Sequence, residues 1–369
     1  MTMISPLKSA GEAVVDLAAV AANVRTVAAA TGTAVMAVVK ADGFGHGAVA
    51  VARAAVAAGA TWLGATSARE ALELRAAGLT APVLSWLHPP DEDFARLIAA
   101  HVDLGVSTVA HLHAVAAAAR TLGRPAHVQL KVDIGLSRNG AGPDDWPELV
   151  AWAHKYETEE TVRVRGVWSH PAGEPATDRE IATYEDAVRV ARAAGLDPPL
   201  LHLANSVTAL AVPRARFGLC RIGIALYGVG PGLRPVMTLR SRVVNVKRVP
   251  AGTGVSYGPD HVTDRPVTLA LLPLGYADGV PRAVRGRAEV WLGGRRCPIV
   301  GRIAMDQCVV DAGDLPVRLG DPVVLFGAGP GEPTVDEWAR WAGTNPHEIL
   351  TGVGTRIPRL HQYGEVRHQ

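Results

Sequence analysis

Short apolar segments alternate with helical stretches over roughly 230 residues, and this alternation constrains the fold more than any other feature. Each segment is short, contains Val, Leu or Ile and is bounded by turn-forming residues, a pattern that predicts a buried strand. Eight strands that alternate with helices predict a (β/α)8 barrel. The predicted strands span residues 35–40, 62–65, 82–87, 102–107, 126–133, 162–169, 200–204 and 217–221.

The pattern changes near Pro235, beyond which alternating strand and turn sequence contains only two short helical segments. We therefore predict the α/β fold class, with a TIM-like barrel over residues 11–236 followed by a smaller, mainly β C-terminal domain over 237–369. Residues 1–10 are expected to be an N-terminal tail that packs with the β domain. Residues 13–31 are predicted to form a helix before the first barrel strand.

Composition excludes several classes of protein. The 369 residues are 48% hydrophobic and 20% charged, with a net charge of +2, so no basic surface indicates nucleic-acid or membrane binding. The three cysteines have no metal-ligand spacing, which suits a reducing compartment and predicts no metal site. Residues 1–10 lack the apolar core of a signal peptide, and no apolar run could span a bilayer. A cytoplasmic location is expected.

Lys40 ends the first predicted strand and is followed by a turn with three glycines, in the sequence AVVKADGFGHG. The chain has only five lysines among its 37 Lys and Arg residues, so a lysine at a buried strand end indicates a need for its particular chemistry. An ε-amine can lose its proton and form a Schiff base, whereas a guanidinium cannot. The alternative from the residues alone is a structural lysine that reaches solvent.

Polar and amphipathic side chains also follow the other predicted strands. Function in this fold lies at the carboxyl ends of the strands. Although a strand-end histidine is more often structural, the convergence of these residues on one rim predicts a site there. The residues at the predicted strand ends are Lys40, Trp86, Asp133 with Arg138 beyond it, His170, His202 with Asn205 and Ser206, and Arg221.

The loops after the seventh and eighth strands are suited to an anion. Ser206 can donate its hydroxyl, and the backbone of Gly223 and Ile224 can donate N–H groups. A lysine and a phosphate site on one rim suggest pyridoxal 5'-phosphate (PLP). Arg221 cannot readily give up a proton, so it would leave the ring nitrogen of PLP unprotonated and a weaker electron sink. Rapid reprotonation, and hence racemisation, is favoured over transamination.

The chain resembles the bacterial alanine racemases of PLP fold type III over nearly its whole length. The segments that carry the resemblance occur in the family's order and span both predicted domains. They are AVVKADGFGHG, LKVDIGLSRNG, WSH, HLANS, RIGIALYG, GVSYG, PLGYADGVPR, GRIAMDQ and TRIPR.

The resemblance implies that Lys40 holds PLP and is one of two acid/base groups. Tyr257, in GVSYG, matches the tyrosine that acts on the opposite face of the substrate. In the family this tyrosine contacts the histidine matching His170, which contacts the arginine matching Arg221. The tyrosine also reaches into the barrel of the partner chain, so the resemblance implies a homodimer with a shared active site.

The resemblance implies roles for further residues. Arg138 and the backbone at Met305 match groups that hold the substrate carboxylate, and Tyr276 matches a tyrosine at the substrate entrance. Lys131 matches a lysine that is often carbamylated and then orients the arginine. Trp86 matches a position beside the cofactor ring.

Two differences from the family concern the phosphate. Phe44 and His347 stand where the family usually has tyrosines whose hydroxyls contact the phosphate, and Phe44 has no hydroxyl to offer. A third difference is Pro171, in a loop that is shortened relative to the family. The leading hypothesis is interconversion of L- and D-alanine for peptidoglycan. The alternatives are a racemase for another amino acid in specialised metabolism and a non-catalytic PLP-binding protein; a metal-dependent PLP aldolase is more remote.

Overall fold

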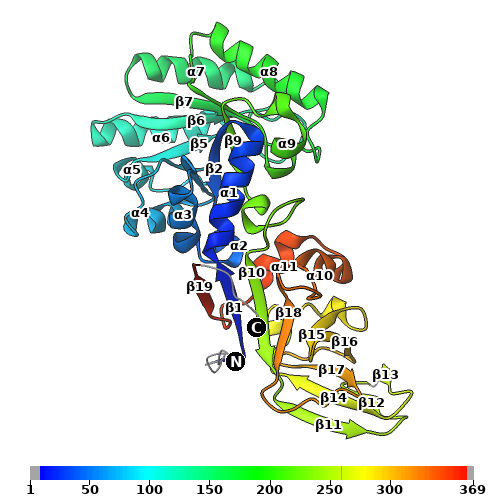
Figure 1. Ribbon diagram of the computed structural model, residues 1–369. Coiled ribbons are helices and arrows are strands. Elements are labelled where there is room, and N and C mark those ends of the chain that lie inside the picture. The colour runs from blue at the N-terminus through cyan, green and yellow to red at the C-terminus, as the bar shows by residue number, and fades with distance from the viewer. Residues whose placement is uncertain (1–8, 259, 364–369) are drawn as a thin grey trace. The chain divides into compact units, whose positions relative to one another are not determined.

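The structure is a computed structural model that describes residues 9–258 and 260–363. The chain divides into two compact units. The barrel unit contains Ala21–Gly43 and Ala48–Leu226, and the β unit contains the described residues up to Val20, the segment Phe44–Gly47 and those from Tyr227 onward. Each unit has its own sheet (Figure 1).

The barrel unit is built on eight parallel strands, which pair in the order β8-β7-β6-β5-β4-β3-β2-β9. Backbone hydrogen bonds from Gly218 to Leu201 and from Arg221 to Ala204 join β9 to the β8 segment and bring the barrel close to closure. The strands are β2 (Ala34–Val38), β3 (Trp62–Ala65), β4 (Val83–Ser85), β5 (Val102–Val106), β6 (Ala126–Lys131), β7 (Val162–Trp168), β8 (Leu200–His202) and β9 (Leu219–Ile222).

Helices connect these strands, as the sequence pattern predicts. Several begin at side-chain caps; Ser67 with Glu70, and Thr177 with Glu180, form capping boxes at the starts of α4 and α8. The helices are α1 (Leu17–Thr31), α3 (Ala48–Ala57), α4 (Ala68–Ala76), α5 (Phe94–Ala99), α6 (Val109–Leu122), α7 (Trp146–Thr158), α8 (Asp178–Ala193) and α9 (Ser206–Ala211), with the 3₁₀ turns η1 (Pro213–Ala215) and η2 (Ile224–Tyr227) near the last strand.

The β unit is organised on a nine-stranded sheet in the order β11-β14-β17-β16-β15-β18-β10-β1-β19. Neighbours in this sheet are antiparallel except β1 and β19, which are parallel. A separate pair joins β12 and β13. The strands are β1 (Gly11–Asp16), β10 (Met237–Arg242), β11 (Asn245–Val249), β12 (Gly254–Val255), β13 (His261–Val262), β14 (Val267–Leu272), β15 (Glu289–Leu292), β16 (Arg295–Val300), β17 (Cys308–Gly313), β18 (Pro322–Phe326) and β19 (Arg359–Gln362).

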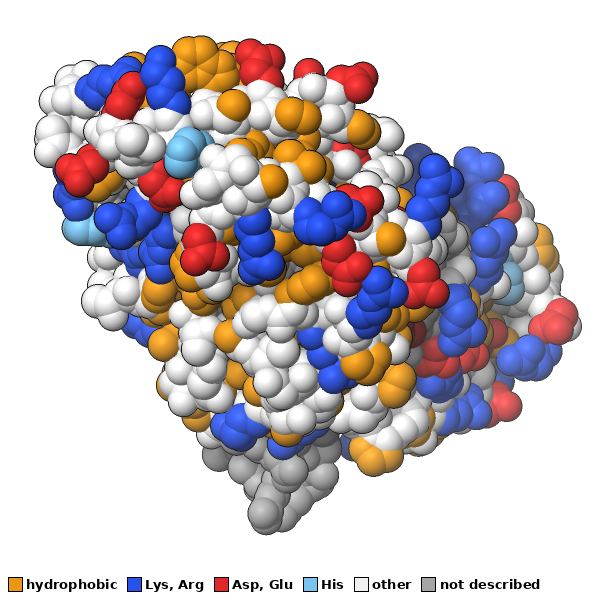
Figure 2. Space-filling model, turned by 90° about the horizontal axis from the view of Figure 1, so that it is seen from above, with side chains coloured by type: hydrophobic (Ala, Val, Ile, Leu, Met, Phe, Trp, Pro, Cys, Tyr) orange, Lys and Arg blue, Asp and Glu red, His pale blue; other side chains and the backbone are white. Residues whose placement is uncertain are grey.

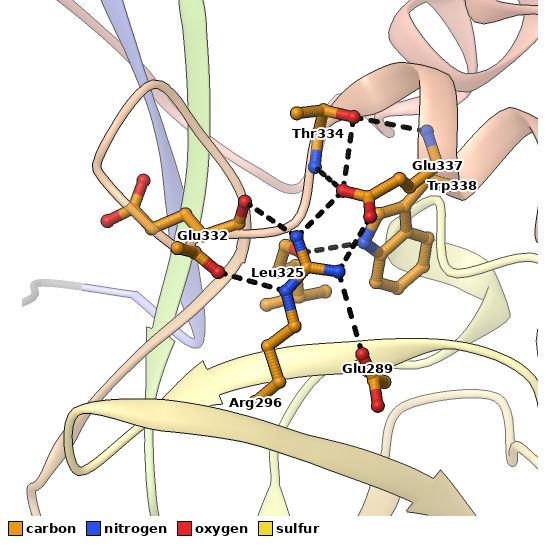
Figure 3. Close-up of polar contacts among 8 residues, drawn as sticks. Glu289, Arg296, Leu325, Glu332, Thr334, Glu337 and Trp338 are labelled. Carbon is orange, nitrogen blue, oxygen red and sulfur yellow. Dashed lines mark hydrogen bonds and ion pairs between the residues drawn. The ribbon is translucent and has the colours of Figure 1, made fainter.

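The helices α10 (Val335–Ala342) and α11 (Pro346–Gly352) and the turns η3 (Tyr276–Asp278) and η4 (Arg282–Val284) complete the β unit. Figure 3 shows how α10 is attached to the sheet: Arg296, on β16, donates two hydrogen bonds of 2.6 and 3.0 Å to Glu337 in the first turn of α10. The indole N–H of Trp338 donates to the Leu325 carbonyl at 2.6 Å. A buried indole and a paired carboxylate together fix the helix on the sheet.

The predicted fold class is confirmed: a (β/α)8 barrel is followed by a mainly β domain. The helix predicted from residue 13 is wrong at its start, because residues 11–16 form β1 and pair with β10 and β19. The first barrel strand ends at Val38, two residues earlier than predicted. The predicted tail lies outside the described residues except for residues 9 and 10. The predicted boundary at residue 236 stays a prediction.

Figure 2 shows basic and acidic side chains interspersed over the face that it presents. The three cysteines are all buried and free. None of the helices in the described part of the chain combines the length and the apolar character that a membrane-spanning segment requires.

Candidate active site at the carboxyl ends of the barrel strands

The segment that begins with Lys40 has an unusual backbone. It forms the short helix α2 (Lys40–Gly45), in which the five residues Ala41–Gly45 have positive φ angles between 51° and 79°. L-amino acids with side chains rarely adopt this left-handed conformation in succession, because the Cβ atom crowds the following carbonyl. Glycines supply two of the five positions, whereas Ala41, Asp42 and Phe44 carry the strain. Such strain concentrates at functional sites.

Glu70 stabilises this turn from the neighbouring strand–helix connection. Its Oε1 accepts the N–H of Ala41 at 2.8 Å, and its Oε2 accepts the N–H groups of Thr66 and Ser67 at 2.7 and 3.3 Å. One carboxylate therefore caps α4 and also fixes the residue next to Lys40. The capping box is readable from the sequence, but the contact with Ala41 is not, since it joins residues 29 positions apart.

Two lysines of the barrel unit have lowered pKa values. Burial lowers the pKa of Lys40, the Arg138 cation lowers it further, and Glu70 opposes both. Burial, followed by the charges of Arg221 and Arg138, lowers the pKa of Lys131 to about 8. The Lys131 Nζ atom lies 4.7 Å from the centre of the Trp168 ring. Both amines thus have more of the neutral, nucleophilic form near neutral pH than an exposed lysine.

Arg221 is almost fully buried and is held by carbonyl groups. Its Nη1 donates to the His202 carbonyl at 2.9 Å, and its Nη2 donates to the carbonyls of Ser169 and Leu203 at 2.6 and 2.9 Å. Burial lowers the pKa of Arg221 to about 10, so the group remains a cation at neutral pH. The guanidinium is therefore a fixed positive charge inside the mouth of the barrel.

His170 follows β7 beside this charge. Burial lowers the pKa of His170 to about 3, and Arg221 and Arg138 are the next largest causes. The imidazole is neutral at physiological pH. No hydrogen bond between His170 and Arg221 is found in the described part of the chain, where Arg221 instead binds the carbonyl of Ser169.

The predicted anion site combines a side chain with a helix start. Ser206 begins α9, and its Oγ accepts the N–H groups of Gly223 and Ala225 at 3.0 and 3.3 Å. Because both bonds use the lone pairs of Oγ, the hydroxyl proton is available to an acceptor. Asn205 caps α9 by accepting the Thr208 N–H at 3.0 Å. For Ile224 no hydrogen bond of the N–H is found among the described residues.

Trp86 occupies a space that two glycines leave open. A Cβ atom at Gly64 would lie 2.9 Å from Trp86 Cζ3, and one at Gly105 would lie 2.9 Å from Trp86 Cβ. The Trp86 and Trp168 ring centres are 5.9 Å apart. The indole is therefore packed at the end of β4, where the resemblance implies a position beside the cofactor ring.

In the β unit, backbone hydrogen bonds bring two predicted substrate residues together. The Tyr276 N–H donates to the Ala304 carbonyl at 3.1 Å, and the Ala277 N–H donates to the Met305 carbonyl at 3.0 Å. Gly275 makes this approach possible, because a Cβ there would lie 2.3 Å from the Met305 oxygen. Tyr276 and Met305 are both about half exposed.

The remaining predicted residues also belong to the β unit. The Phe44 ring is buried and lies 4.6 Å from the ring centre of Tyr227 and 5.7 Å from that of His347. Tyr257 follows β12, and 66% of its surface is exposed. The structure thus brings Phe44 and His347 together, and Tyr276 and Met305 together, within this unit.

The barrel unit contains the other predicted residues. Five of them lie close enough on one rim for the charge of one to shift the pKa of another. These five are Lys40, Lys131, Arg138, His170 and Arg221. Two residues of the site were not predicted. Glu70 is recognisable in the sequence only as part of the capping box of α4, and the signal for Ser169 is its place between Trp168 and His170 in the segment WSH. Within the described residues no cluster of three or more His, Cys, Asp or Glu side chains could hold a metal ion.

Comparison with known proteins agrees with the fold. The family model for the alanine racemase N-terminal domain matches residues 15–231, and the model for the alanine racemase C-terminal domain matches residues 236–361. The alanine racemase of Frankia casuarinae is 51% identical over 366 residues, covering 95% of each chain. The alanine racemase of Thermobifida fusca is 48% identical over 375 residues, covering 98% of this chain and 100% of the relative.

The solved structures that resemble this chain are also alanine racemases. Alanine racemase from D-cycloserine-producing Streptomyces lavendulae aligns with a TM-score of 0.95 at 45% identity and covers 98% of this chain and 100% of its own. The alanine racemase of Bacillus anthracis, solved with bound L-Ala-P, aligns with a TM-score of 0.86 at 31% identity, covering 97% and 96%. The chain is thus an amino-acid racemase, an isomerase. It belongs to the alanine racemase family.

Proposed function

We propose that the protein interconverts L- and D-alanine with PLP as cofactor, using Lys40 and Tyr257 as the two acid/base groups. The observation that carries this proposal is a half-buried lysine of lowered pKa, at a strained turn on the barrel rim, in a chain of the alanine racemase family. The cofactor and the two-base mechanism come from the resemblance and from the chemistry of the residues present.

The residues of the barrel unit fit PLP. The hydroxyl proton of Ser206 is free for a phosphate oxygen, and the neutral form of Lys40 is the one that can hold an aldehyde covalently. Gly223, Ile224, His202 and Asn205 are proposed to line the same cofactor site, with Trp86 beside the ring. When bound, PLP supplies a conjugated ring that stabilises negative charge at the substrate Cα.

Arg221 is proposed to face the ring nitrogen. Because its pKa of about 10 keeps it charged at neutral pH, it does not give the ring a proton. Negative charge at Cα is then short-lived, and rapid return of a proton favours racemisation over transamination. His170, neutral beside Arg221, is proposed to contact the catalytic tyrosine.

Racemisation requires removal of a proton from one face of Cα and delivery to the other. Lys40 is proposed to serve one face, and Tyr257 the other. Tyr257 is two-thirds exposed in the single chain, as expected of a residue that meets a second copy. We therefore propose a homodimer in which the Tyr257 of one copy completes the site of the other.

Arg138 and the Met305 backbone are proposed to bind the substrate carboxylate, with Tyr276 at the entrance. Carbamylation of Lys131 would turn a cation beside Arg138 into an anion that can orient it. Phe44 and His347 are proposed to adjoin the phosphate.

The proposed physiological product is D-alanine for peptidoglycan, made in the cytoplasm. The three buried, free cysteines are consistent with a reducing compartment.

The test is incubation of the PLP-loaded protein in D₂O with a panel of L-amino acids, followed by chiral chromatography and mass spectrometry. The expected result is selective formation of Cα-deuterated D-alanine, lost in Lys40→Ala. Tyr257→Phe should slow exchange more in one direction of proton transfer, because only one face loses its acid/base group. Full Cα exchange by Tyr257→Phe would contradict the two-base assignment.

The same panel separates the alternatives. Selective formation of another D-amino acid would keep the mechanism and replace the substrate and the peptidoglycan role. Exchange with none of the amino acids, despite bound PLP, would overturn the proposed activity in favour of a non-catalytic PLP-binding protein.

A further inference from the structure

A row of polar side chains crosses the interior of the barrel below the candidate site. Its members are Asp103, Gln129 and His202, each at most 1% exposed, and it ends on Arg221. Asp103 is the second residue of β5, Gln129 lies in the middle of β6 and His202 is the last residue of β8. The row therefore runs from the amino ends of the parallel strands toward their carboxyl ends. Neither Asp103 nor Gln129 has a role in the proposed chemistry.

The side chains form a continuous chain of hydrogen bonds. Arg221 Nη1 lies 3.2 Å from His202 Nδ1, and His202 Nε2 lies 2.8 Å from Gln129 Oε1. Gln129 Nε2 then donates to Asp103 Oδ2 at 2.9 Å. Buried polar groups connected in this way determine one another's orientation, because each unmatched donor or acceptor would cost the desolvation of that group.

The direction of every bond follows from its two ends. A guanidinium only donates, so His202 Nδ1 is an acceptor without a proton, and the proton of the neutral ring is on Nε2. That Nε2–H donates to Gln129 Oε1, which leaves the Gln129 amide to donate to Asp103. An ionised carboxylate only accepts, so the chain is consistent from one end to the other.

A salt bridge anchors the lower end. Arg165 Nη1 lies 3.0 Å from Asp103 Oδ1, and His127 Nδ1 lies 3.7 Å from the same oxygen. Burial raises the pKa of Asp103, whereas Arg165 and the Gln129 hydrogen bond oppose that shift. The Arg165 side chain is 29% exposed, so the ion pair reaches the surface at the amino ends of the strands.

The upper end determines which group Arg221 can offer to a ligand. Its Nη1 and Nη2 donate the bonds to His202, Ser169 and Leu203. Among the described residues no hydrogen bond from Nε of Arg221 is found, which leaves Nε as its available donor. The Trp168 ring stacks on His202 at an interplanar angle of 3° and so restricts rotation of the imidazole.

We propose that Asp103 and Gln129 are positioning residues: they hold His202 in its Nε2-protonated form, so that Nδ1 accepts from Arg221 and fixes the orientation of the guanidinium. The inference rests on the proposed function for its catalytic consequence, because Arg221 is there assigned to the cofactor ring. The hydrogen-bond order itself stands on the barrel interior alone.

Asp103→Asn is the sharpest perturbation, because it replaces one oxygen by an amide donor with little change in shape. If the new NH₂ group faces Gln129, the Gln129 amide must turn, and its own NH₂ then meets His202 Nε2–H. If it faces Arg165 instead, two donors oppose each other and the salt bridge is lost. His127→Gln is the matched control: it changes a group near Asp103 that is outside the hydrogen-bonded row.

The experiment measures the ¹⁵N resonances of histidine in the holoenzyme, with His202 assigned by its substitution, together with kcat and KM for racemisation. The parent protein should show His202 neutral and protonated on Nε2. Asp103→Asn should shift His202 away from this form and lower kcat about tenfold, with KM changed less than about twofold. His127→Gln should leave both readouts as in the parent. Gln129→Leu breaks the row without adding a donor and should also lower kcat. This second variant keeps the test decisive if Asp103→Asn does not fold.

Two outcomes would overturn the inference. One is a parent His202 that is protonated on Nδ1. The other is an unchanged His202 resonance and kcat in both variants, with only the melting temperature lowered, which would make the row purely structural. Absence of racemisation by the parent would instead contradict the proposed function, while the parent resonance would still test the hydrogen-bond order.

Discussion

At position 40 the chain has a lysine, although arginine is its usual cation. The structure gives this lysine a lowered pKa by burial and by the nearby charge of Arg138. An arginine in the same place would stay protonated and could neither bind an aldehyde nor remove a proton. At the scale of single residues, therefore, the chemistry of the proposed site depends on an amine that can become neutral.

Phe44 bears on how tightly the cofactor is held. We predict that Phe44→Tyr slows PLP release by about one to two orders of magnitude, because a hydrogen bond to a charged group contributes about 1.5–3 kcal/mol. The measurement is the rate of PLP loss to an apo acceptor protein. Phe326→Tyr is the control, since it adds the same hydroxyl to another buried ring of the β unit, one that packs near Trp338. An unchanged release rate in Phe44→Tyr would mean that position 44 does not limit retention.

Lys131 leads to a prediction about pH. The folded protein lowers its pKa from 10.5 to about 8, so the neutral amine forms as the pH rises through about 8 rather than through 10.5. Since CO₂ reacts with the neutral amine, the carbamylated fraction in bicarbonate should rise between about pH 7 and pH 9. Carbon-13 NMR with labelled bicarbonate measures this carbamylated fraction. Lys131→Arg should abolish the signal, whereas Lys155→Arg, at a lysine on the surface of α7 beside Trp152, should not.

At the scale of elements, one carboxylate couples the start of α4 to the turn that carries Lys40. We predict that Glu70→Gln slows racemisation about tenfold, because one of its oxygens becomes a donor that faces backbone N–H groups and the turn shifts. It should also reduce the free energy of unfolding by about 1–2 kcal/mol.

Ser67→Ala is the matched control for this prediction. It removes the other half of the capping box, the 3.3 Å bond to the Glu70 N–H, but leaves the bond from Ala41 to Glu70 in place. It should cost about 1 kcal/mol of stability with little change in rate. Equal loss of activity in the two variants would show that the helix cap matters and the contact with Ala41 does not.

At the scale of the whole molecule, the proposed site requires two copies of the chain. Lys40→Ala and Tyr257→Phe should each be nearly inactive, but dissociation and reassociation of an equal mixture should restore about a quarter of the parental activity. Half of the dimers are then mixed, and each mixed dimer has one intact site. Rate measurements before and after mixing test this. No recovery, with mixed dimers demonstrated by mass spectrometry, would place both groups of a site on one chain.

Much of the architecture follows from local patterns. Each barrel strand lies in a short, mainly apolar segment, so eight strands could be predicted within a few residues of their bounds. The helix predicted from residue 13 shows the limit of this reasoning. Residues 13–15 continue the apolar pattern of α1, but they pair with β10 and β19, more than 200 positions away, and those pairings override local preference.

The barrel, the β domain and the residue types at the strand ends could be predicted from local patterns, because these depend on hydrophobic periodicity and on chemistry that each residue carries. The left-handed turn after Lys40, its bond to Glu70, and the row from Asp103 to Arg221 are seen only in the folded chain. The bond to Glu70 and the row are contacts between separate strands or loops, where one donor meets one acceptor, and the turn is held in place by the first of them. No periodic pattern encodes such a meeting, because the partners become neighbours only when the sheet closes around them.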